Sequence, residues 1–252
     1  MRAMTNQEID ACVDVLSQAR LSGKWIEALP AAPSSAAEAH LIQDRVATAL
    51  GEAVGAFKIN ALPGDEPTRG LIYARMIRPS PARIAPAEAP HLGVEAEIAF
   101  RFTRDLPARE TPYRREEAAE AMVALPAIEV VSSRFREPRA RPPLEQLADC
   151  LINGALVPGR ETRDWSRLDL ARLQVTLKVN GETVVRRQGG HVGDDPPGFA
   201  VALVNAMRGA GGVKAGQIVT TGSWTGLQFL RPGDRCSIDF EGLGGAEVAF
   251  EG

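Results

Sequence analysis

The order of the sequence patterns constrains the fold most strongly, because helical patterns come first and strand patterns then dominate. From Val54 onward, short segments rich in β-branched or alternating apolar residues follow one another, as half-buried strands do. Two further helical patterns interrupt them, at 115–124 and 197–208. Strands that do not alternate regularly with helices argue against a doubly wound parallel sheet. The pattern therefore predicts the α+β class.

Two helices are expected at the start of the chain. Thr5 and Glu8 have the spacing of a capping box, and apolar residues then recur at helical intervals. A second helical pattern covers 35–50. These helices predict an N-terminal helical subdomain over 1–53, followed by a strand-rich domain over 54–252.

Two dipeptides in the strand region predict hairpins. Asn180-Gly181 lies between two alternating runs, and both residue types tolerate the positive φ that a two-residue hairpin turn requires. Gly244-Gly245 is expected to form a second hairpin.

Charge and composition exclude several classes of partner. The net charge of -3 is mixed in sign along the 252 residues, which argues against nucleic acid and membrane surfaces. Apolar runs fall short of the roughly 18 residues that span a bilayer, and the first residues do not resemble a secretory signal. The three cysteines are widely spaced and predict neither disulfides nor a zinc site. We therefore expect a cytoplasmic protein.

The segment 93–102, GVEAEIAFRF, carries the clearest functional pattern. Alternate side chains of a strand share a face, so Glu95 and Glu97 are expected on one face, roughly 7 Å apart, with apolar residues on the other. Glu129 likewise lies between apolar neighbours in a second strand. Three carboxylates are suitable ligands for a hard divalent cation. The alternative is that these glutamates line the wet face of an amphipathic strand.

Several motifs, taken in order, resemble one family. G-V-E-A-E-I-A-F, L-P-A-I-E-V-V, the G-A-F-K-I-N strand, L-A-D-C-L-I-N-G-A-L-V-P-G and A-G-Q-I-V-T-T-G-S are similar to segments of the 2-keto-4-pentenoate hydratase and 4-oxalocrotonate decarboxylase group, within the fumarylacetoacetate hydrolase superfamily. The resemblance implies a mixed β-roll core with an N-terminal helical part, and commonly a homo-oligomer. It also implies Mg²⁺ or Mn²⁺ held by Glu95, Glu97 and Glu129.

The resemblance further implies a lyase that acts on small 2-oxo acids or their enols. A hydratase that adds water at C4 is the main expectation, and a decarboxylase of the 4-oxalocrotonate type is the alternative. Lys58 is the candidate proton-handling residue, with a pKa lowered by partial burial. Ser223 and Thr221 are candidate substrate donors, unless they are ordinary strand residues. Asp149 is a candidate substrate-binding residue, with a structural cap or turn as the alternative.

The sequence also departs from the pattern that it resembles. An acidic residue usual in the segment after the lysine strand is replaced at Ala74 and Arg75, and the aspartate usual after the third glutamate is replaced by Ser132. These changes leave open a catalytically altered ligand-binding homologue. An acylpyruvate-type C–C hydrolase would need a histidine paired with a glutamate, for which His40 and His91 are weak candidates.

Overall fold

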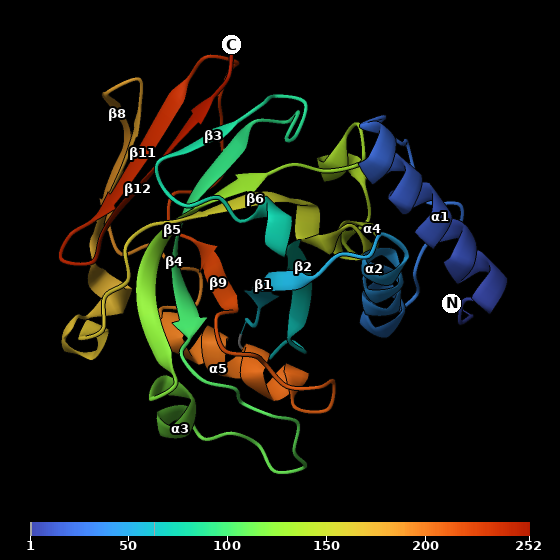
Figure 1. The fold of residues 1–252 in the computed structure, drawn as a ribbon, viewed down its shortest axis with the longest axis horizontal. Helices are drawn as coiled ribbons and strands as arrows, with labels where there is room; N and C mark the ends of the chain where they lie inside the picture. Colours follow the sequence, from blue (N-terminus) through green and yellow to red (C-terminus); the bar gives the residue numbers. More distant parts are fainter. Residues whose placement is uncertain (1, 63) are drawn as a thin grey trace.

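The computed structural model describes residues 2–62 and 64–252 and contains two β-sheets (Figure 1). The larger sheet has the spatial order β2 (Thr68–Tyr73), β1 (Val54–Asn60), β9 (Ile218–Ser223), β4 (Gly93–Phe102), β5 (Met122–Val131) and β6 (Asn153–Pro158), with β10 (Gln228–Phe229) paired to the start of β4. The smaller sheet has the order β3 (Ala82–Ile84), β12 (Gly244–Phe250), β11 (Arg235–Phe240), β7 (Gln174–Val179) and β8 (Glu182–Gln188).

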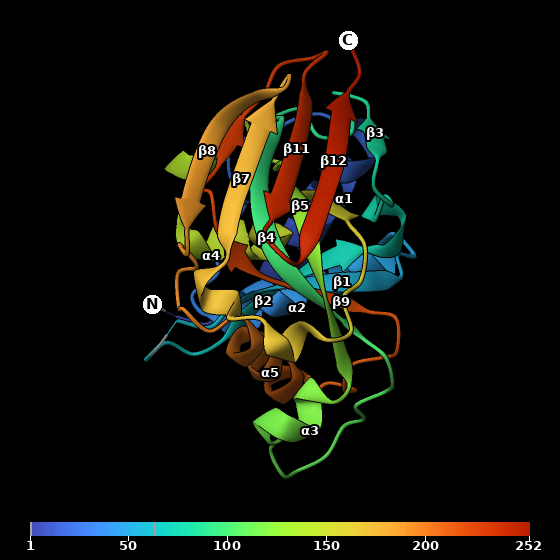
Figure 2. The same ribbon diagram turned by 90° about the vertical axis from the view of Figure 1, so that its left-hand side faces the viewer.

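Both sheets are mixed. β1 runs parallel to β9 and β12 runs parallel to β3, whereas β4 is antiparallel to both β5 and β9. Figure 2 shows the smaller sheet in front of the larger one. Mixed sheets combined with helices confirm the expected α+β class and agree with the fold that the motifs imply.

The main core lies between the sheets. Apolar side chains of β4, which alternate along the strand, are fully buried together with residues of β7 and β11. These residues are Val94, Ala96, Ile98, Phe100, Phe102, Leu177 and Phe240. The apolar face of β4 expected from the sequence is therefore present, and it fixes which side of the strand the glutamates occupy.

The helices cover the larger sheet at two places. They are α1 (Asn6–Ser22), α2 (Ala36–Ala49), α3 (Arg115–Ala119), α4 (Pro143–Ala148) and α5 (Pro196–Met207), with single 3₁₀ turns at η1 (Ala74–Met76), η2 (Pro138–Ala140), η3 (Cys150–Ile152), η4 (Trp165–Arg167) and η5 (Leu170–Arg172). In Figure 1, α1, α2 and α4 lie together at one end, and α5 lies near β1 and β9. None of the described helices is long and apolar enough to cross a membrane.

Capping fixes both N-terminal helices. Thr5 and Glu8 form the capping box expected for α1, and Gly23 ends the helix in the left-handed conformation. The apolar cluster of α1 and α2 is completed by Phe135 and Leu147, which lie far along the chain. The boundary expected at residue 53 stays a prediction, because these later residues also belong to the helical layer.

Two local predictions need correction. The helix expected over 115–124 ends at Ala119, because Met122 already pairs with Phe102 in the long β4–β5 ladder. The Gly244-Gly245 hairpin turn is displaced, since both glycines belong to β12 and the chain turns just before them. The Asn180-Gly181 hairpin is confirmed, with φ of 52° and 88° between β7 and β8.

Candidate metal centre

Three glutamates meet on one face of the larger sheet. The antiparallel register of β4 and β5 places Glu95 directly opposite Glu129, and Glu97 lies two residues further along the same face. One carboxylate oxygen from each side chain lies within 4.8 Å of those of the other two. The sequence could indicate that Glu95 and Glu97 share a face, but the position of Glu129 beside them depends on the pairing of β4 with β5.

Two of these carboxylates are buried and the third, Glu95, is half-buried, so the cluster is not on the wet face of an amphipathic strand. Glu97 is 2% exposed and Glu129 is 0% exposed. Like charges placed directly opposite each other on a sheet are destabilising. Burial and then the charge of Glu129 raise the pKa of Glu95, and the same two causes raise the pKa of Glu97 well above its ordinary value. The positive charge near these carboxylates therefore does not offset their burial and mutual repulsion.

The hydrogen bonds of the cluster are incomplete. Glu97 Oε2 accepts from the backbone N–H of Gly222 at 2.8 Å, and Glu129 Oε1 accepts from Asn153 Nδ2 at 3.1 Å. Glu129 Oε2 is buried and has no hydrogen-bond partner among the described residues. A buried carboxylate oxygen without a partner calls for an explanation. Three converging oxygens with an unsatisfied buried atom fit a hard divalent cation.

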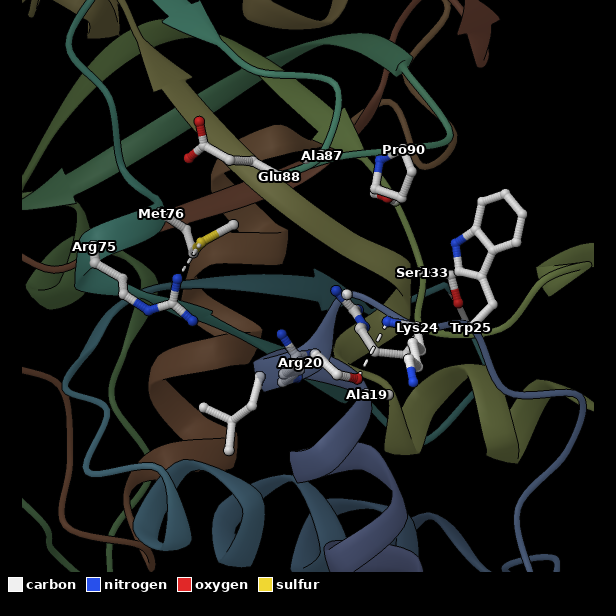
Figure 3. A pocket seen from close by; sticks show the side chains of 15 residues that line it. Ala19, Arg20, Lys24, Trp25, Arg75, Met76, Ala87, Glu88, Pro90 and Ser133 are labelled. Carbon is white, nitrogen blue, oxygen red and sulfur yellow. Dashed lines mark hydrogen bonds between the residues drawn. The ribbon is translucent and has the colours of Figure 1, made fainter.

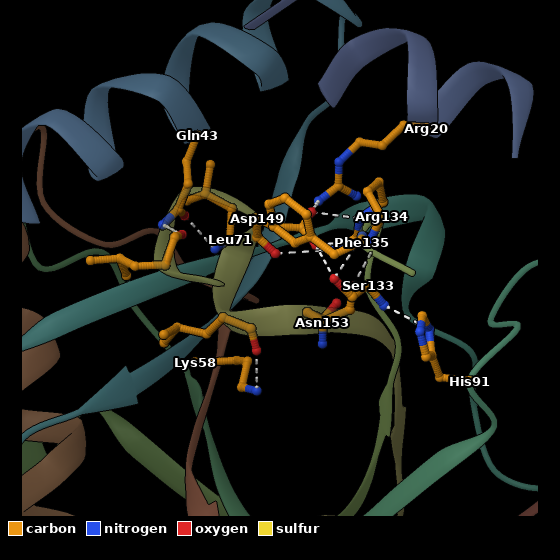
Figure 4. Close-up of polar contacts among 12 residues, drawn as sticks. Arg20, Gln43, Lys58, Leu71, His91, Ser133, Arg134, Phe135, Asp149 and Asn153 are labelled. Carbon is orange, nitrogen blue, oxygen red and sulfur yellow. Dashed lines mark hydrogen bonds and ion pairs between the residues drawn. The ribbon is translucent and has the colours of Figure 1, made fainter. Parts of the chain in front are cut away.

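Lys58 supplies the positive charge that the described residues bring to this cluster. Its Nζ lies 2.8 Å from Glu129 Oε1 and donates to the carbonyl oxygen of Leu151 at 2.8 Å (Figure 4). Burial alone would lower the pKa of Lys58, but the combined negative charges of Glu129, Glu95 and Glu97 outweigh it, and the pKa is raised. The expected lowering of this pKa is therefore wrong, because burial was considered without the glutamates.

Lys58 and the glutamates come together because β9 lies between β1 and β4 in the sheet. Lys58 pairs with Thr220 across the parallel β1–β9 ladder, and Ser223 pairs with Glu97 across the β4–β9 ladder. Small apolar residues continue the same sheet face beyond the polar groups: Ala56, Ala99, Ala127 and Ile218. The polar groups thus occupy one end of this face, small apolar residues its middle, and Arg101, which pairs with Ile218, the other end.

A cavity of about 290 Å³ opens beside the glutamates. Its polar lining includes Lys58, Glu95, Glu97, Thr220 and Ser223, and its apolar lining includes Ile59, Leu151, Ile152, Val192 and Phe199. Among the described residues, Lys58 is the only cationic side chain that lines it, and it is already paired with Glu129. The cavity can hold a small molecule with one polar and one apolar end.

The two predicted substrate donors differ in position. The Ser223 hydroxyl lines the cavity and has no hydrogen-bond partner in the described part of the chain. Thr221 does not line it, and its hydroxyl donates to the carbonyl of Ile98 at 2.7 Å. Thr220 lines the cavity instead. Its hydroxyl is buried and has no hydrogen-bond partner among residues 2–62 and 64–252. Because side chains alternate along a strand, the two threonines of T-T-G-S must point to opposite faces. The sequence alone does not show which of these faces carries the glutamates.

Asp149 is engaged elsewhere. Its Oδ2 accepts from the Ser133 hydroxyl at 2.7 Å and from the Arg134 N–H at 2.9 Å, and its Oδ1 accepts from Arg134 Nε at 2.5 Å (Figure 4). Asp149 is fully buried and does not line the cavity beside the glutamates. These contacts favour the structural role that was the alternative for this residue.

The candidate histidines lie away from the glutamates. His40 accepts from the backbone N–H of Arg69 at 3.1 Å, and His91 Nδ1 lies 3.2 Å from the Ser132 hydroxyl. Neither lines the cavity at Glu95 and Glu97. The geometry therefore gives no support to a histidine–glutamate pair of the hydrolase type.

Comparisons with known proteins show which family the chain resembles. Residues 73–250 match the family model described as fumarylacetoacetate (FAA) hydrolase C-terminal. The 2-keto-4-pentenoate hydratase of Paraburkholderia xenovorans (strain LB400) is 28% identical over 262 residues, covering 98% of this chain and 97% of the relative. The 4-oxalocrotonate decarboxylase of Pseudomonas sp. (strain CF600) is 27% identical, covering 64% of this chain and 60% of the relative.

One solved structure has the same fold over nearly its whole length. The 4-oxalocrotonate decarboxylase from Pseudomonas putida G7, complexed with magnesium and adipate, superposes with a TM-score of 0.85. The alignment covers 99% of this chain and 100% of that chain, at 23% sequence identity. At this identity the likeness shows the fold alone.

Proposed function

The chain belongs to the fumarylacetoacetate hydrolase family, and on that premise we propose that it is a divalent-metal-dependent lyase, a hydratase of the 2-keto-4-pentenoate type. The substrate would be a 2-hydroxydienoate or 2-oxo-enoate acid, to which water adds at C4 to give a 4-hydroxy-2-oxo acid. The observation that carries the proposal is the meeting of Glu95, Glu97 and Glu129 around an unsatisfied buried oxygen. Relatives named 2-keto-4-pentenoate hydratase support the reaction class.

Glu95, Glu97 and Glu129 would hold Mg²⁺ or Mn²⁺. Their oxygen-only donor set suits these cations, and a structure of the same fold is complexed with magnesium. The bound cation would supply Lewis-acid stabilisation for the negative charge that develops at the 2-oxo acid end of the substrate. Asn153 and the backbone N–H of Gly222 hold two of the three carboxylates in place.

Lys58 would hold and deliver the proton at its Nζ. In the metal-free chain the three glutamates raise the pKa of Lys58, so its side chain is charged and would act as a proton donor to the reacting substrate. The hydroxyl groups of Thr220 and Ser223 have no other partners among the described residues and would orient the polar end of the substrate. Leu151, Val192 and Phe199 would contact its hydrocarbon end.

The lining of the cavity favours the hydratase over the decarboxylase. A 4-oxalocrotonate-type substrate carries a second carboxylate, and a buried carboxylate needs a cation or several donors. Apart from Lys58, the donor side chains of the described lining are uncharged: the amides of Asn60 and Gln146, of which Gln146 already donates to the Arg141 carbonyl, and the hydroxyls of Thr220 and Ser223. A second carboxylate would therefore find no second cation in this described lining. The decarboxylase remains the second candidate because a relative and a structure of the same fold carry that name.

The test is turnover of 2-hydroxypenta-2,4-dienoate by the full chain with Mg²⁺, followed as loss of the ultraviolet absorbance of the conjugated acid. We expect turnover that EDTA abolishes and that added Mg²⁺ restores. A parallel assay with 4-oxalocrotonate, followed by release of CO₂, should be much slower. Tight binding of 2-oxo acids without any turnover would instead identify a ligand-binding homologue, and faster CO₂ release would identify the decarboxylase.

We also propose a compartment, an oligomeric state and a class of partner for the enzyme. We expect a cytoplasmic homo-oligomer with a helical subdomain over 1–53, whose partner is the small-molecule substrate and not nucleic acid or a membrane. Sedimentation of the purified chain at several concentrations tests the oligomeric state.

A further inference from the structure

A second cavity, of about 300 Å³, lies at the end of α1, and we call it the α1 pocket. Four segments line it: residues 19–25 at the end of α1, Arg75 and Met76 of η1, the loop 87–90, and residues 132–134 after β5. Figure 3 shows the side chains that these segments bring around the cavity. Its lining shares no residue with that of the cavity beside Glu95 and Glu97, so it is a separate site.

The α1 pocket is strongly cationic. Arg20, Lys24, Arg75 and Arg134 line it, and Glu88 is its only acidic side chain. Glu88 is itself paired with Arg78 at 2.8 Å. Arg75 and Ser132, where the sequence departs from the pattern that it resembles, both line this cavity.

These cationic side chains differ in how fully they are already paired within the protein. Arg75 is paired with Glu52. Arg134 uses all three of its nitrogens, since Nε donates to Asp149 Oδ1, Nη1 donates to the Asn153 carbonyl at 3.0 Å, and Nη2 donates to the Asp149 carbonyl at 3.1 Å. Neither of these two arginines therefore has a strong need for another anion.

Arg20 is different. Its side chain is only 9% exposed, and its one polar contact among the described residues is a long one of 3.4 Å, from Nη2 to Asp149 Oδ1. That carboxylate already serves Arg134, so two buried guanidinium groups share one directly contacting carboxylate (Figure 4), although the more distant Glu52 also helps to raise the pKa of Arg20. The Tyr73 ring, 4.9 Å from the guanidinium carbon, offers only partial compensation. A buried charge without a full partner is costly, and an anion would offset that cost.

Lys24 adds a second free donor at the mouth of the pocket. It is exposed, and no ion pair or hydrogen bond of its ammonium occurs within residues 2–62 and 64–252. A guanidinium and an ammonium that line one cavity suit a small oxyanion, because carboxylate and phosphate oxygens accept two parallel bonds from arginine.

We propose that the α1 pocket is a binding site for a small oxyanion, a carboxylate or a phosphate, held between Arg20 and Lys24. Arg20 forms the buried end of the site and Lys24 its entrance. The ligand supplies the negative charge that Arg20 and Arg134 together lack. The site does not depend on the metal centre or on its activity.

Calorimetric titration of the metal-free full chain with inorganic phosphate, acetate and succinate, at constant ionic strength, tests the proposal. We expect saturable binding of one anion per chain. Trp25 lines the pocket and is 40% exposed, whereas Trp224 is fully buried, so binding should also change the fluorescence of Trp25. The Trp25→Phe variant should lose that signal and keep the calorimetric binding. Tighter binding of phosphate identifies a phosphate-type ligand, and tighter binding of acetate or succinate identifies a carboxylate.

Variants of the two donors locate the site. Arg20→Gln should weaken binding at least about tenfold, as loss of a charged donor does. Lys24→Gln should weaken it about threefold and Lys24→Glu more strongly, because the exposed lysine contributes less. Lys24 variants cannot disturb the core, so they remain informative if Arg20→Gln destabilises the fold. The matched control is Arg45→Gln, an arginine of α2 that is paired with Asp10 and lies outside the pocket, and its binding should be unchanged.

Two results would overturn the proposal. One is the absence of saturable binding for all three anions by the unmodified chain. The other is binding that stays unchanged in both Lys24→Glu and a folded Arg20→Gln variant.

Discussion

Two buried charge clusters of opposite sign meet at Asn153, and their difference shows how a functional site can be distinguished from a structural one. On one side, Glu95, Glu97 and Glu129 face the single ammonium of Lys58. On the other side, Arg20 and Arg134 face the single carboxylate of Asp149. The Asn153 amide donates to Glu129, and the Asn153 carbonyl accepts from Arg134.

The clusters differ in which atoms are left without partners. Both oxygens of Asp149 accept hydrogen bonds, so this carboxylate is fully used in holding residues 133–134 to the end of α4. Glu129 is equally buried, but its Oε2 has no partner among the described residues. Burial of a charged group is therefore not itself a sign of function. Two groups are informative: Glu129 Oε2, which is buried without a partner among the described residues, and the Arg20 guanidinium, whose contact with Asp149 is long.

The largest expected effect is that of Glu129→Gln on activity. Loss of a direct metal ligand should exceed the 10–100-fold cost of losing a group that only orients a ligand. We therefore expect kcat/KM at saturating Mg²⁺ to fall at least about 1,000-fold. In the metal-free variant, relief of repulsion among the carboxylates is offset by loss of the direct ion pair with Lys58, so its thermal stability should stay close to that of the unmodified chain. Glu161→Gln, an exposed residue paired with Arg101, is the control and should keep full activity. Near-normal turnover by Glu129→Gln would show that the ligand assignment is wrong.

Asp149→Asn should give the largest loss of stability. The substitution leaves two buried guanidinium groups without a counter-charge, and breaking a buried pair typically costs about 3–5 kcal/mol. Urea unfolding should therefore show a fall of about 3 kcal/mol in the free energy of unfolding. The exposed pair of Asp10 and Arg45 offers the control, since Asp10→Asn should cost less than about 1 kcal/mol. Equal effects of the two substitutions would remove the structural role that we assign to Asp149.

Lys58→Ala should separate proton handling from metal binding. Loss of a positioned proton donor typically costs about 100-fold or more, so kcat should fall by about that factor. The dissociation constant for Mg²⁺ should stay the same or decrease, because the removed ammonium repels a cation that shares Glu129. Lys58→Arg, which keeps the charge, should retain part of the activity. An unchanged kcat in Lys58→Ala would transfer the proton-handling role to another residue.

Asn153→Ala is expected to have the smallest effect. It removes one donor to Glu129 Oε1 and leaves the backbone carbonyl that binds Arg134 in place. Mg²⁺ affinity should fall about tenfold, as is typical when a ligand loses its orienting hydrogen bond. Stability should change little, because the arginine cluster is untouched. If stability falls as much as in Asp149→Asn, the two clusters are one structural unit and the distinction between them fails.

Local chemistry was enough to predict some elements in detail. The capping box of α1, the strand over 93–102 and the hairpin at Asn180-Gly181 each depend on residues close together in the chain. The expected end of α3 was wrong because pairing with β4 extends β5 into the helical pattern. The turn expected at Gly244-Gly245 was displaced for a similar reason. Gly245 lies where a Cβ would come within 2.3 Å of the Ile238 carbonyl, so the glycine serves a close approach of strands and not a turn.

The features of the candidate site likewise divide into those that the sequence predicts and those that only the tertiary structure shows. The sequence by itself determined that Glu95 and Glu97 share a face, because alternation is a property of one strand. Only the tertiary structure decided that Glu129 stands opposite Glu95, that Thr220 and not Thr221 lines the cavity, and that Lys58 is held charged. Those facts depend on the pairing of strands that are far apart in the chain. Register between such strands is set by which faces are buried, and a local pattern does not contain that information.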